Sequence, residues 1–403
     1  MLRDPTTLRR RRAAVAGAFF VQGLLFISLT LRLPLVQRTF DVDEVQLSGL
    51  MLLMVLLAGL GSVLAELAAA RVGSAATLRC AMVGLALGTL VMGAALGSGG
   101  MTPFVVGLAV YGTALGAVDA TCNMQAVALE HRLDRPILPS SHGAWTAGGL
   151  LATIVALTLP GLDPSRAAMA LAVVPLLVVA LPLLGRDATP AAPTTPVDIP
   201  WRAVVMVGLG LVLFYMVDTA TTAWGPVYLA SPEVFTDPPT SSQMVALATL
   251  PYLAATMLAR LAGDRLTARF GAPALVRTGA VIASVGLFVV VLAPASVWPV
   301  AVLGFFVTGL GVAVIAPLSF SAAAAIAGHD VDPAQRRARV DAVIARFNQF
   351  NYVGALLGAV LTGAIGGVSL RIGFAVPALL VLGMLPLARH FADTRQRRRE
   401  PHP

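Results

Sequence analysis

The stretch Gly263–Gly271 reads GDRLTARFG, and a related stretch, Ala65–Gly73, reads AELAAARVG. In each stretch an acid is followed by an arginine and then by a glycine at the same spacing, and the second set lies 198 residues after the first. Both stretches follow a long apolar run. The repeat therefore predicts two related halves, packed about an axis along the membrane normal.

The composition indicates a membrane protein. Of the 403 residues 57% are apolar and 12% are charged, whereas soluble proteins carry about 25% charged residues. Apolar stretches recur at close to the ~20 residues that a helix needs to cross the hydrocarbon core. In this context the net charge of +8 does not indicate a nucleic-acid partner.

The apolar runs are too long and too uniform for the alternating strands of a membrane barrel, so helices are expected throughout. Twelve spans are predicted, which makes the fold class an all-α polytopic membrane protein with twelve transmembrane helices in two six-helix halves. The predicted spans are residues 13–33, 45–66, 78–98, 103–129, 141–160, 167–185, 202–229, 241–262, 274–294, 297–327, 340–366 and 370–390.

Arginine placement predicts the orientation. With the N-terminus inside, only four arginines fall on predicted external segments, and nearly all the others fall on internal ones: the four are Arg32, Arg38, Arg166 and Arg371. Basic residues concentrate on the cytoplasmic side of membrane proteins. We therefore expect a multi-pass protein of the bacterial inner (plasma) membrane with both termini in the cytoplasm.

The segment GRDATPAAPTTPVDIPWR, residues 185–202, predicts a linker, because it is rich in proline and small polar residues. It divides the chain into an N-terminal half (residues 1–185), a cytoplasmic linker (186–201) and a C-terminal half (202–403).

GDRLTARFG resembles the loop signature of the major facilitator superfamily, although the first-half copy has Glu66 and Leu67 where the signature has aspartate and arginine. Shorter motifs resemble the MosC-like (rhizopine-transport-like) branch of that superfamily. These are RLP (32–34), DATCNMQAVALE (119–130), SSHGAWTAGGL (140–150), AWGPVYL (223–229) and NYVGALLG (351–358). The resemblance implies the major facilitator fold and secondary transport by alternating access.

The fourth predicted span contains an aspartate. Placing a charged aspartate near the centre of a membrane helix costs ~2.5–3.5 kcal/mol on insertion scales. Helical spacing places Asp119, Asn123 and Glu130 on one face with Gly112 and Gly116. Two interpretations stay open: a cavity-lining acid that binds substrate or a proton, and a polar bridge between helices.

The fifth span begins with His142 and Trp145, which share a face. Because His142 and the lower part of span four both lie toward the inner side, His142 could contact Asp119 and relay protons. The alternative is an ordinary interfacial histidine.

The seventh span carries a second acid, Asp218, which shares a face with Thr222 and lies near the membrane midplane. Transporter sites are commonly found at that depth. In the MosC-like branch this region resembles a Glu-Gly pair followed by Asp-Trp. Here the second acid is absent, since Ala223 precedes Trp224.

Other polar residues complete the predicted site. Asn348 and Asn351 in span eleven and Gln22 in span one could hydrogen-bond a polar ligand. Arg32, Glu130 and Arg346 are candidate gate residues, and for the two arginines an interfacial anchor is the alternative.

The repeated loops have a different predicted role. An acid at the inner end of a helix can pair with arginine or cap the next helix, and that contact must break when the halves move. The predicted conformational latch consists of Asp264, Arg265 and Arg269, with Glu66 and Arg71 as its first-half counterpart.

Together these features predict a secondary transporter, monomeric, that moves a small polar or amphipathic solute, with protons as the coupling ion. Uncoupled facilitation and multidrug or natural-product export are alternatives, and a non-transporting sensor is a remote one. An enzyme that binds Mg²⁺ through clustered carboxylates is disfavoured, because the acids lie singly on separate helices. No metal, cofactor or nucleic acid is expected, and the expected partners are substrate, protons and the lipid bilayer.

Overall fold

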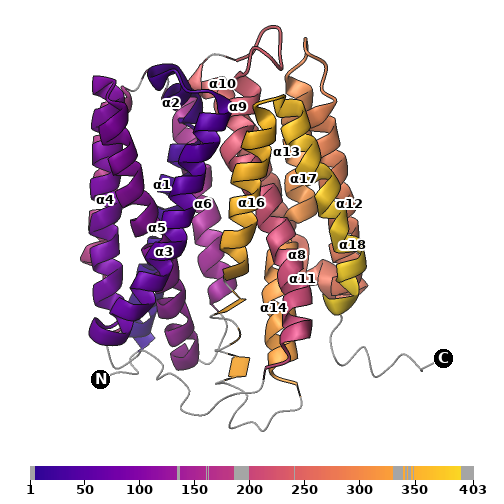
Figure 1. Ribbon diagram of the computed structural model, residues 1–403. Coiled ribbons are helices and arrows are strands. Elements are labelled where there is room, and N and C mark those ends of the chain that lie inside the picture. Colours follow the sequence, from indigo (N-terminus) through magenta and orange to yellow (C-terminus); the bar gives the residue numbers. More distant parts are fainter. Residues whose placement is uncertain are drawn as a thin grey trace, which may run out of the picture. The chain divides into compact units, whose positions relative to one another are not determined.

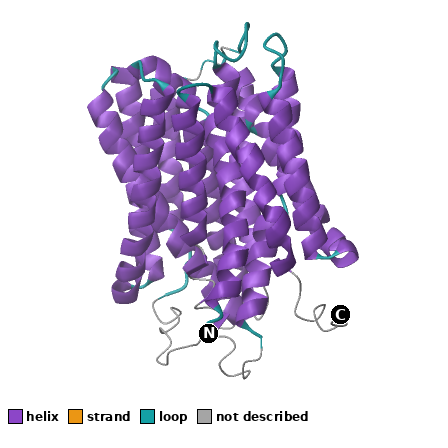
Figure 2. Ribbon diagram, turned by 45° about the vertical axis from the view of Figure 1, so that its right-hand side comes forward, coloured by secondary structure: helices purple, strands orange, loops and turns teal. Residues whose placement is uncertain are grey.

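The computed structural model describes residues 5–133, 137–159, 161, 163–185, 199–239, 241–329, 339–340, 343, 346–347 and 349–391. Within these residues the chain is helical and contains no strand (Figure 2). Side chains of a few further residues, including Glu130 and Asp264, lie outside the description.

The helices correspond in order to the twelve predicted spans (Figure 1). Spans one to six are α1 (Pro5–Thr30), α3 (Glu44–Val72), α4 (Ser74–Ser98), α5 (Met101–Leu133), α6 (Leu138–Thr158) and α7 (Pro164–Val179). Spans seven to nine are α8 (Trp201–Thr219) with η2 (Ala220–Trp224) and α9 (Gly225–Ala230), then α11 (Leu250–Phe270) and α12 (Ala272–Val291). Spans ten to twelve are α13 (Pro299–Val312) with α14 (Ile315–Ala327), then α16 (Gln349–Gly366), and α17 (Leu370–Leu380) with η4 (Val381–Gly383), α18 (Met384–Leu387) and η5 (Ala388–Phe391).

In the part of the chain that the structure describes, ten helical segments are long and apolar enough to cross a membrane, and α7 contains a shorter apolar helix. The first span differs from its predicted start at residue 13, because α1 already begins at Pro5 and includes the arginine run. Arginine is a good helix former, so a charged N-terminal segment can extend an apolar helix into the headgroup region. A short helix, α2 (Leu33–Phe40), follows α1, and two short segments, α10 (Ser242–Val245) and η3 (Ala246–Ala248), precede α11.

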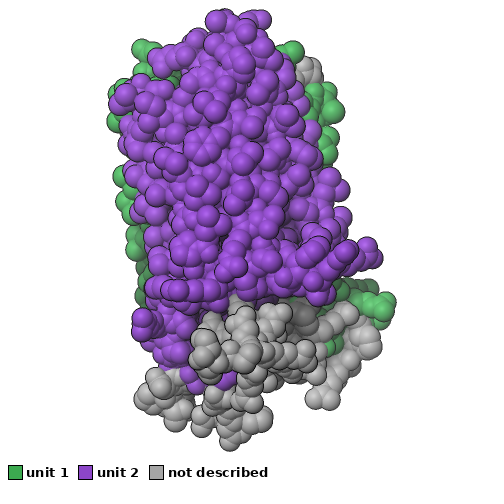
Figure 3. Space-filling view, turned by 90° about the vertical axis from the view of Figure 1, so that its right-hand side faces the viewer, with its two compact units in different colours: residues 1–190, 241–246 green, residues 191–240, 247–403 purple. Residues whose placement is uncertain are grey.

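The chain divides into two compact units, coloured separately in Figure 3. Unit 1 comprises Met1–Pro190 and Ser241–Ala246, and unit 2 comprises Ala191–Thr240 and Leu247–Pro403. The predicted linker falls mostly on residues 186–198, which lie outside the described part.

The two units repeat one packing pattern. In unit 1 the main helix pairs are α4 with α5, α3 with α5, α1 with α6 and α4 with α7, which are spans 3–4, 2–4, 1–5 and 3–6. In unit 2 the corresponding pairs are α12 with α13, α11 with α13, α8 with α16 and α12 with α17, which are spans 9–10, 8–10, 7–11 and 9–12, and α16 also packs against α17. These four pairs are those of unit 1 displaced by six spans, so the two halves share this packing pattern.

The loop repeat has a structural basis in its glycines. Gly73 and Gly271 each end one helix and begin the next, with φ of 90° and 79°. Only glycine adopts such a backbone conformation without a steric penalty. The sharp turns between spans 2 and 3 and between spans 8 and 9 therefore need glycine at both positions.

Close backbone approaches hold the spans together. A Cβ on Gly116 of α5 would meet the carbonyl of Ala58 on α3, and one on Gly358 of α16 would meet the carbonyl of Met216 on α8. In a lipid environment small residues at such contacts supply the packing that the hydrophobic effect does not.

Candidate functional site

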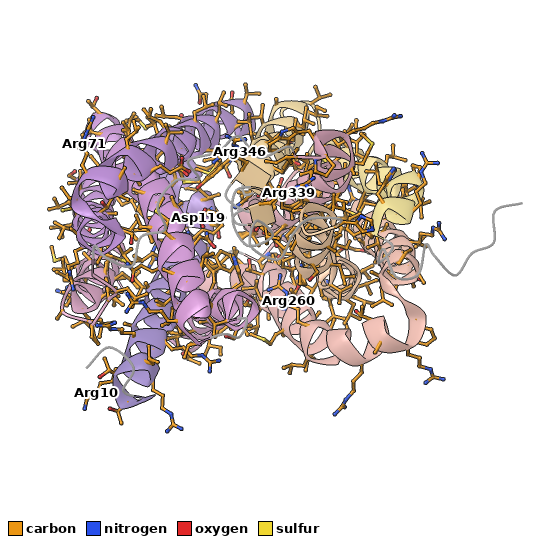
Figure 4. All side chains as sticks on the ribbon, turned by 90° about the horizontal axis from the view of Figure 1, so that it is seen from below. Arg10, Arg71, Asp119, Arg260, Arg339 and Arg346 are labelled. Carbon is orange, nitrogen blue, oxygen red and sulfur yellow. The ribbon has the colours of Figure 1, made fainter. Side chains whose placement is uncertain are left out.

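Asp119 is linked to the first span. The Nε2 of Gln22 on α1 donates a hydrogen bond to Oδ1 of Asp119 on α5, at 3.2 Å. Gln22 is 6% exposed and Asp119 is half-buried. Viewed along the helices in Figure 4, Asp119 lies among the helices of unit 1, whereas Arg71 and Arg10 lie at its edge.

The other end of the Gln22 amide is unusual. Its Oε1 is buried and, within the described residues, has no hydrogen-bond partner. A buried carbonyl oxygen without a donor costs about 1–3 kcal/mol. The Asp119 carboxylate and Gln22 Oε1 therefore form an adjacent pair of hydrogen-bond acceptors, which suits a ligand that presents donors.

Asn123, which was predicted to line the site beside Asp119, bonds to its own helix. Its Nδ2 donates to the backbone oxygen of Asp119, one turn earlier, at 2.9 Å. Its side chain is half-buried.

The side chains of His142 and Trp145 on α6 pack against aromatic residues of α1. The ring centroids of Phe19 and His142 are 5.1 Å apart, and those of Phe26 and Trp145 are 6.0 Å apart. Phe19, Gln22 and Phe26 follow helical spacing and share one face of α1. That face brings together the predicted residues of spans one, four and five.

The glycine-bearing face of α5 is occupied by a neighbouring helix. Added Cβ atoms on Gly112 and Gly116 would meet the carbonyls of Met54 and Ala58 on α3. These two glycines therefore serve helix packing in this arrangement, while Asp119 contacts α1.

A third polar residue of α5 has a structural role that the sequence did not reveal. The fully buried Gln125 donates to Ser74 Oγ at 2.8 Å and to the Leu184 carbonyl at 3.1 Å, and its Oε1 accepts from the Leu184 N–H at 2.8 Å. Its hydrogen bonds connect α5 to the start of α4 and to the segment after α7. We therefore assign Gln125 a role in stabilising the fold.

In unit 2 the second acid has a close partner. The hydroxyl of Tyr252 on α11 donates to Oδ1 of Asp218 on α8 at 2.6 Å. Tyr252 is fully buried and Asp218 is half-buried. Thr222, predicted beside Asp218, donates to the backbone oxygen of Asp218 at 2.7 Å.

The seventh span changes helix type beside this acid. η2, a π-helical turn from Ala220 to Trp224, begins two residues after Asp218. Such turns are rare and occur frequently at functional sites. Trp224 is fixed there by a hydrogen bond from its Nε1 to the Ala359 carbonyl, at 2.9 Å.

Two residues near Asp218 were not predicted. The Arg260 guanidinium lies within electrostatic range of the Asp218 carboxylate, and its Nε donates to the Ala313 carbonyl at 3.1 Å. Arg260 lies in the apolar segment Ala246–Gly263, and a charge inside an apolar run was the signal that could have identified it. Tyr252 carried no such signal, because a tyrosine in a membrane helix is ordinary.

The predicted residues of span eleven are only partly described. Asn348 lies outside the described residues, and Asn351 is half-buried on α16. Arg346 is exposed, with its guanidinium carbon 5.5 Å from the centroid of the Trp201 ring. A cation over an aromatic ring is typical of an interfacial anchor.

Arg32 lies between α1 and α2, where its Nη1 donates to the Ser28 carbonyl at 2.7 Å. Burial lowers the pKa of the Arg32 guanidinium below its ordinary value. The bond supplies a partner to a carbonyl in the last turn of α1, which is a common role for arginine at a helix end.

The predicted latch residues lie at helix ends. Glu66, Arg71, Arg265 and Arg269 are all exposed. The guanidinium carbon of Arg269 is 5.2 Å from the Phe270 ring centroid. The side chains of Asp264 and of the candidate gate residue Glu130 lie outside the described part.

The described residues contain no group of three or more His, Cys, Asp or Glu side chains that could hold a metal ion.

The repeated units and their twelve spans have the major facilitator fold. The nucleoside transporter NupG superposes with a TM-score of 0.64 at 16% identity, covering 94% of this chain and 98% of that one. The E. coli fucose:proton symporter FucP superposes with a TM-score of 0.57 at 16% identity, covering 95% and 98%. The predicted fold class is confirmed.

Sequence comparisons agree with the fold. A model of the Major Facilitator Superfamily matches residues 230–403. An uncharacterized MFS-type transporter of Yersinia pestis is 27% identical over 386 residues, covering 92% of this chain and 93% of that protein. Membrane protein MosC of Rhizobium meliloti is 27% identical over 321 residues, covering 78% and 75%. The chain is thus a multi-pass membrane protein, and its resemblance to major facilitator transporters, including MosC, is confirmed.

Proposed function

We propose that this protein is a secondary transporter that moves a small polar or amphipathic solute across the bacterial inner membrane by alternating access, coupled to protons. We further propose that it acts as a monomer with both termini in the cytoplasm, and that residues 1–185 and 202–403 act as the two halves, joined by the linker 186–201. One observation carries the proposal: Asp119 in unit 1 and Asp218 in unit 2 each lie within an apolar span, and each accepts a hydrogen bond from an uncharged side chain.

Uncharged partners suit an acid that must change its protonation state. The amide of Gln22 and the hydroxyl of Tyr252 each contain both a donor and an acceptor. Each can donate to an ionised carboxylate and accept from a protonated one. Asp119 and Asp218 can therefore gain and lose a proton without losing their partners.

Relatives in structure support the coupling and the type of solute. FucP is a fucose:proton symporter and NupG is a nucleoside transporter, and both substrates are small and polar. The acceptor pair of Asp119 and Gln22 Oε1, with the His142 and Trp145 rings that α6 packs against α1, would bind such a solute through its donors and its apolar surface.

We assign the predicted residues as follows. Substrate and proton binding involve Gln22, Asp119, Asn123, His142, Trp145, Asp218, Thr222, Asn348 and Asn351. Gating involves Arg32, Glu130 and Arg346. The conformational latch consists of Glu66, Arg71, Asp264, Arg265 and Arg269.

Uncoupled facilitation is the second candidate, in which the acids only hold substrate. It is favoured by the unpartnered Gln22 carbonyl beside Asp119, because a substrate donor at that position needs no proton movement. The protonation of the two acids distinguishes the candidates.

The test is uptake into proteoliposomes under an imposed pH gradient, across a panel of sugar-like, nucleoside-like and cationic amphipathic compounds. Asp119→Asn and Asp218→Asn are compared with wild type and with Asp237→Asn, a matched control because Asp237 is exposed in the segment after α9. We expect wild type and the control to accumulate substrate in response to the gradient. At least one of the site variants should lose the response by tenfold or more. Wild-type rates and gradient responses in both site variants would refute the assignment.

A further inference from the structure

The bond between Tyr252 and Asp218 has the geometry of a strong, charge-assisted hydrogen bond. The distance of 2.6 Å between Tyr252 Oη and Asp218 Oδ1 lies in the range of about 2.5–2.7 Å that is typical of O–H···O⁻ contacts. Tyr252 is fully buried, so water does not compete for its hydroxyl. A hydrogen bond of this kind favours the ionised form of a carboxylate.

A second group on the same helix acts in the same direction. Arg260 lies two turns after Tyr252 on α11, and its positive charge interacts with the Asp218 carboxylate. The two groups that favour the ionised carboxylate are therefore both carried by α11, whereas Asp218 is on α8. Any separation of α11 from α8 would remove both effects at once.

Within the described residues, the elements that pack on α8 carry few ionisable side chains. Helices α13 and α14, which pack on α8, carry no ionisable side chain. Within the described part of the chain, the other ionisable groups on α8 and on the elements packed against it are Arg202, Tyr215, Tyr352, Arg371, Arg389 and His390, and Arg346 lies over Trp201 at the start of α8. Arg371 donates to the carbonyls of Val291, Ala293 and Val234, which occupy its guanidinium.

We infer that Tyr252 is a positioning residue that determines the pH at which Asp218 binds its proton. The bond favours the ionised carboxylate relative to an Asp218 that lacks it. When the bond is broken, the carboxylate takes a proton from water at higher pH, and no covalent bond changes. The inference rests on the proposed function, because it concerns how the protein controls proton binding at Asp218, one of the two proposed coupling acids.

The test is the pH profile of uptake by Tyr252→Phe, a variant that removes only the hydroxyl. We expect the pH of half-maximal gradient-driven uptake to rise by about one unit, so that a roughly tenfold lower proton concentration suffices. Tyr228→Phe is the matched control, because its hydroxyl donates to the Val290 carbonyl at 2.7 Å in the same unit and not to an acid. The control should keep the wild-type midpoint.

A second measurement does not depend on transport. Carbodiimide reagents modify protonated carboxyl groups, so the pH dependence of Asp218 labelling, followed by peptide mass spectrometry, reports its protonation directly. Tyr252→Phe should label at higher pH than wild type, by the same unit. A changed uptake rate with unchanged midpoints in both assays would overturn the inference and leave Tyr252 a packing residue.

The two proposals fail in different ways. If Asp119→Asn and Asp218→Asn both keep the gradient response, the proposed coupling is wrong whatever Tyr252 does. If Asp218→Asn loses the response while Tyr252→Phe keeps the wild-type midpoints, only the inference about Tyr252 is wrong.

Discussion

The two halves share a scaffold but differ at their acids. In unit 1 the acid is Asp119 in span four, and span one supplies the amide of Gln22. In unit 2 the acid itself is in span seven, the counterpart of span one, and span eight supplies the hydroxyl of Tyr252. Asp218 lies 196 residues after Gln22, close to the 198-residue offset of the loop repeat, so related positions carry an amide in one half and a carboxylate in the other.

This difference shows that the repeat determines packing and not chemistry. The helix pairs and the turn glycines are duplicated, because each half must solve the same packing problem. The polar residues are free to diverge. We therefore expect the acid pairs to have different roles: Asp119 with Gln22 binds substrate donors, and Asp218 with Tyr252 binds the proton.

The largest effect that tests this comparison is expected from Gln22→Leu, which keeps a similar side-chain volume and removes both polar atoms. Hydrogen bonds to charged groups contribute about 1.5–3 kcal/mol, so the KM for uptake should rise by tenfold or more. The pH midpoint of uptake should stay at its wild-type value. Kinetics in proteoliposomes at several pH values measure both quantities.

Tyr111→Phe is the control for Gln22→Leu, because the buried Tyr111 hydroxyl on the same helix as Asp119 has no hydrogen-bond partner in the described part of the chain. It should leave the KM within about twofold. If Gln22→Leu moves the pH midpoint and not the KM, the roles assigned to the two acids are reversed.

A smaller effect is expected at the shared scaffold. A Cβ on Gly116 would meet the Ala58 backbone, whereas one on Gly59 of α3 would meet nothing within 4 Å. Gly116→Ala should lower the thermal unfolding midpoint by several degrees. Gly59→Ala should leave it equal or slightly higher, since alanine is favoured over glycine in a helix by up to about 1 kcal/mol. Equal midpoints for both variants would show that the close approach of α3 and α5 does not limit stability.

Much of the fold could be predicted from the sequence. Apolar runs of membrane-crossing length predicted the helices and their order, ten of which are long and apolar enough to cross a membrane in the described part. The spacing shared by Glu66, Arg71 and Gly73 with their counterparts predicted the repeat. The predicted helix boundaries were less accurate where a helix extends beyond its apolar run into charged residues. The start of α1 at Pro5 is the main case, because hydropathy ends at the arginine run while the helix does not.

Individual residues of the site could be predicted from the sequence, but the contacts between them could not. Asp119, Gln22 and Asp218 stood out because polar groups in apolar runs are costly, but a period of 3.6 residues describes one helix and not its neighbours. The bond from Gln22 to Asp119 and the bond from Tyr252 to Asp218 depend on how helices pack, which a single sequence does not encode in any local pattern. Tyr252 and Gln125 were missed for that reason.

We propose that substrate and protons move together through this protein. The most direct test is proton movement driven by substrate alone, recorded with a pH-sensitive dye inside proteoliposomes with no imposed gradient. On addition of a transported solute we expect wild type to change the internal pH. We expect Asp218→Asn to exchange that solute across the membrane while the internal pH stays constant. Solute uptake by wild type with no change in internal pH would contradict proton coupling.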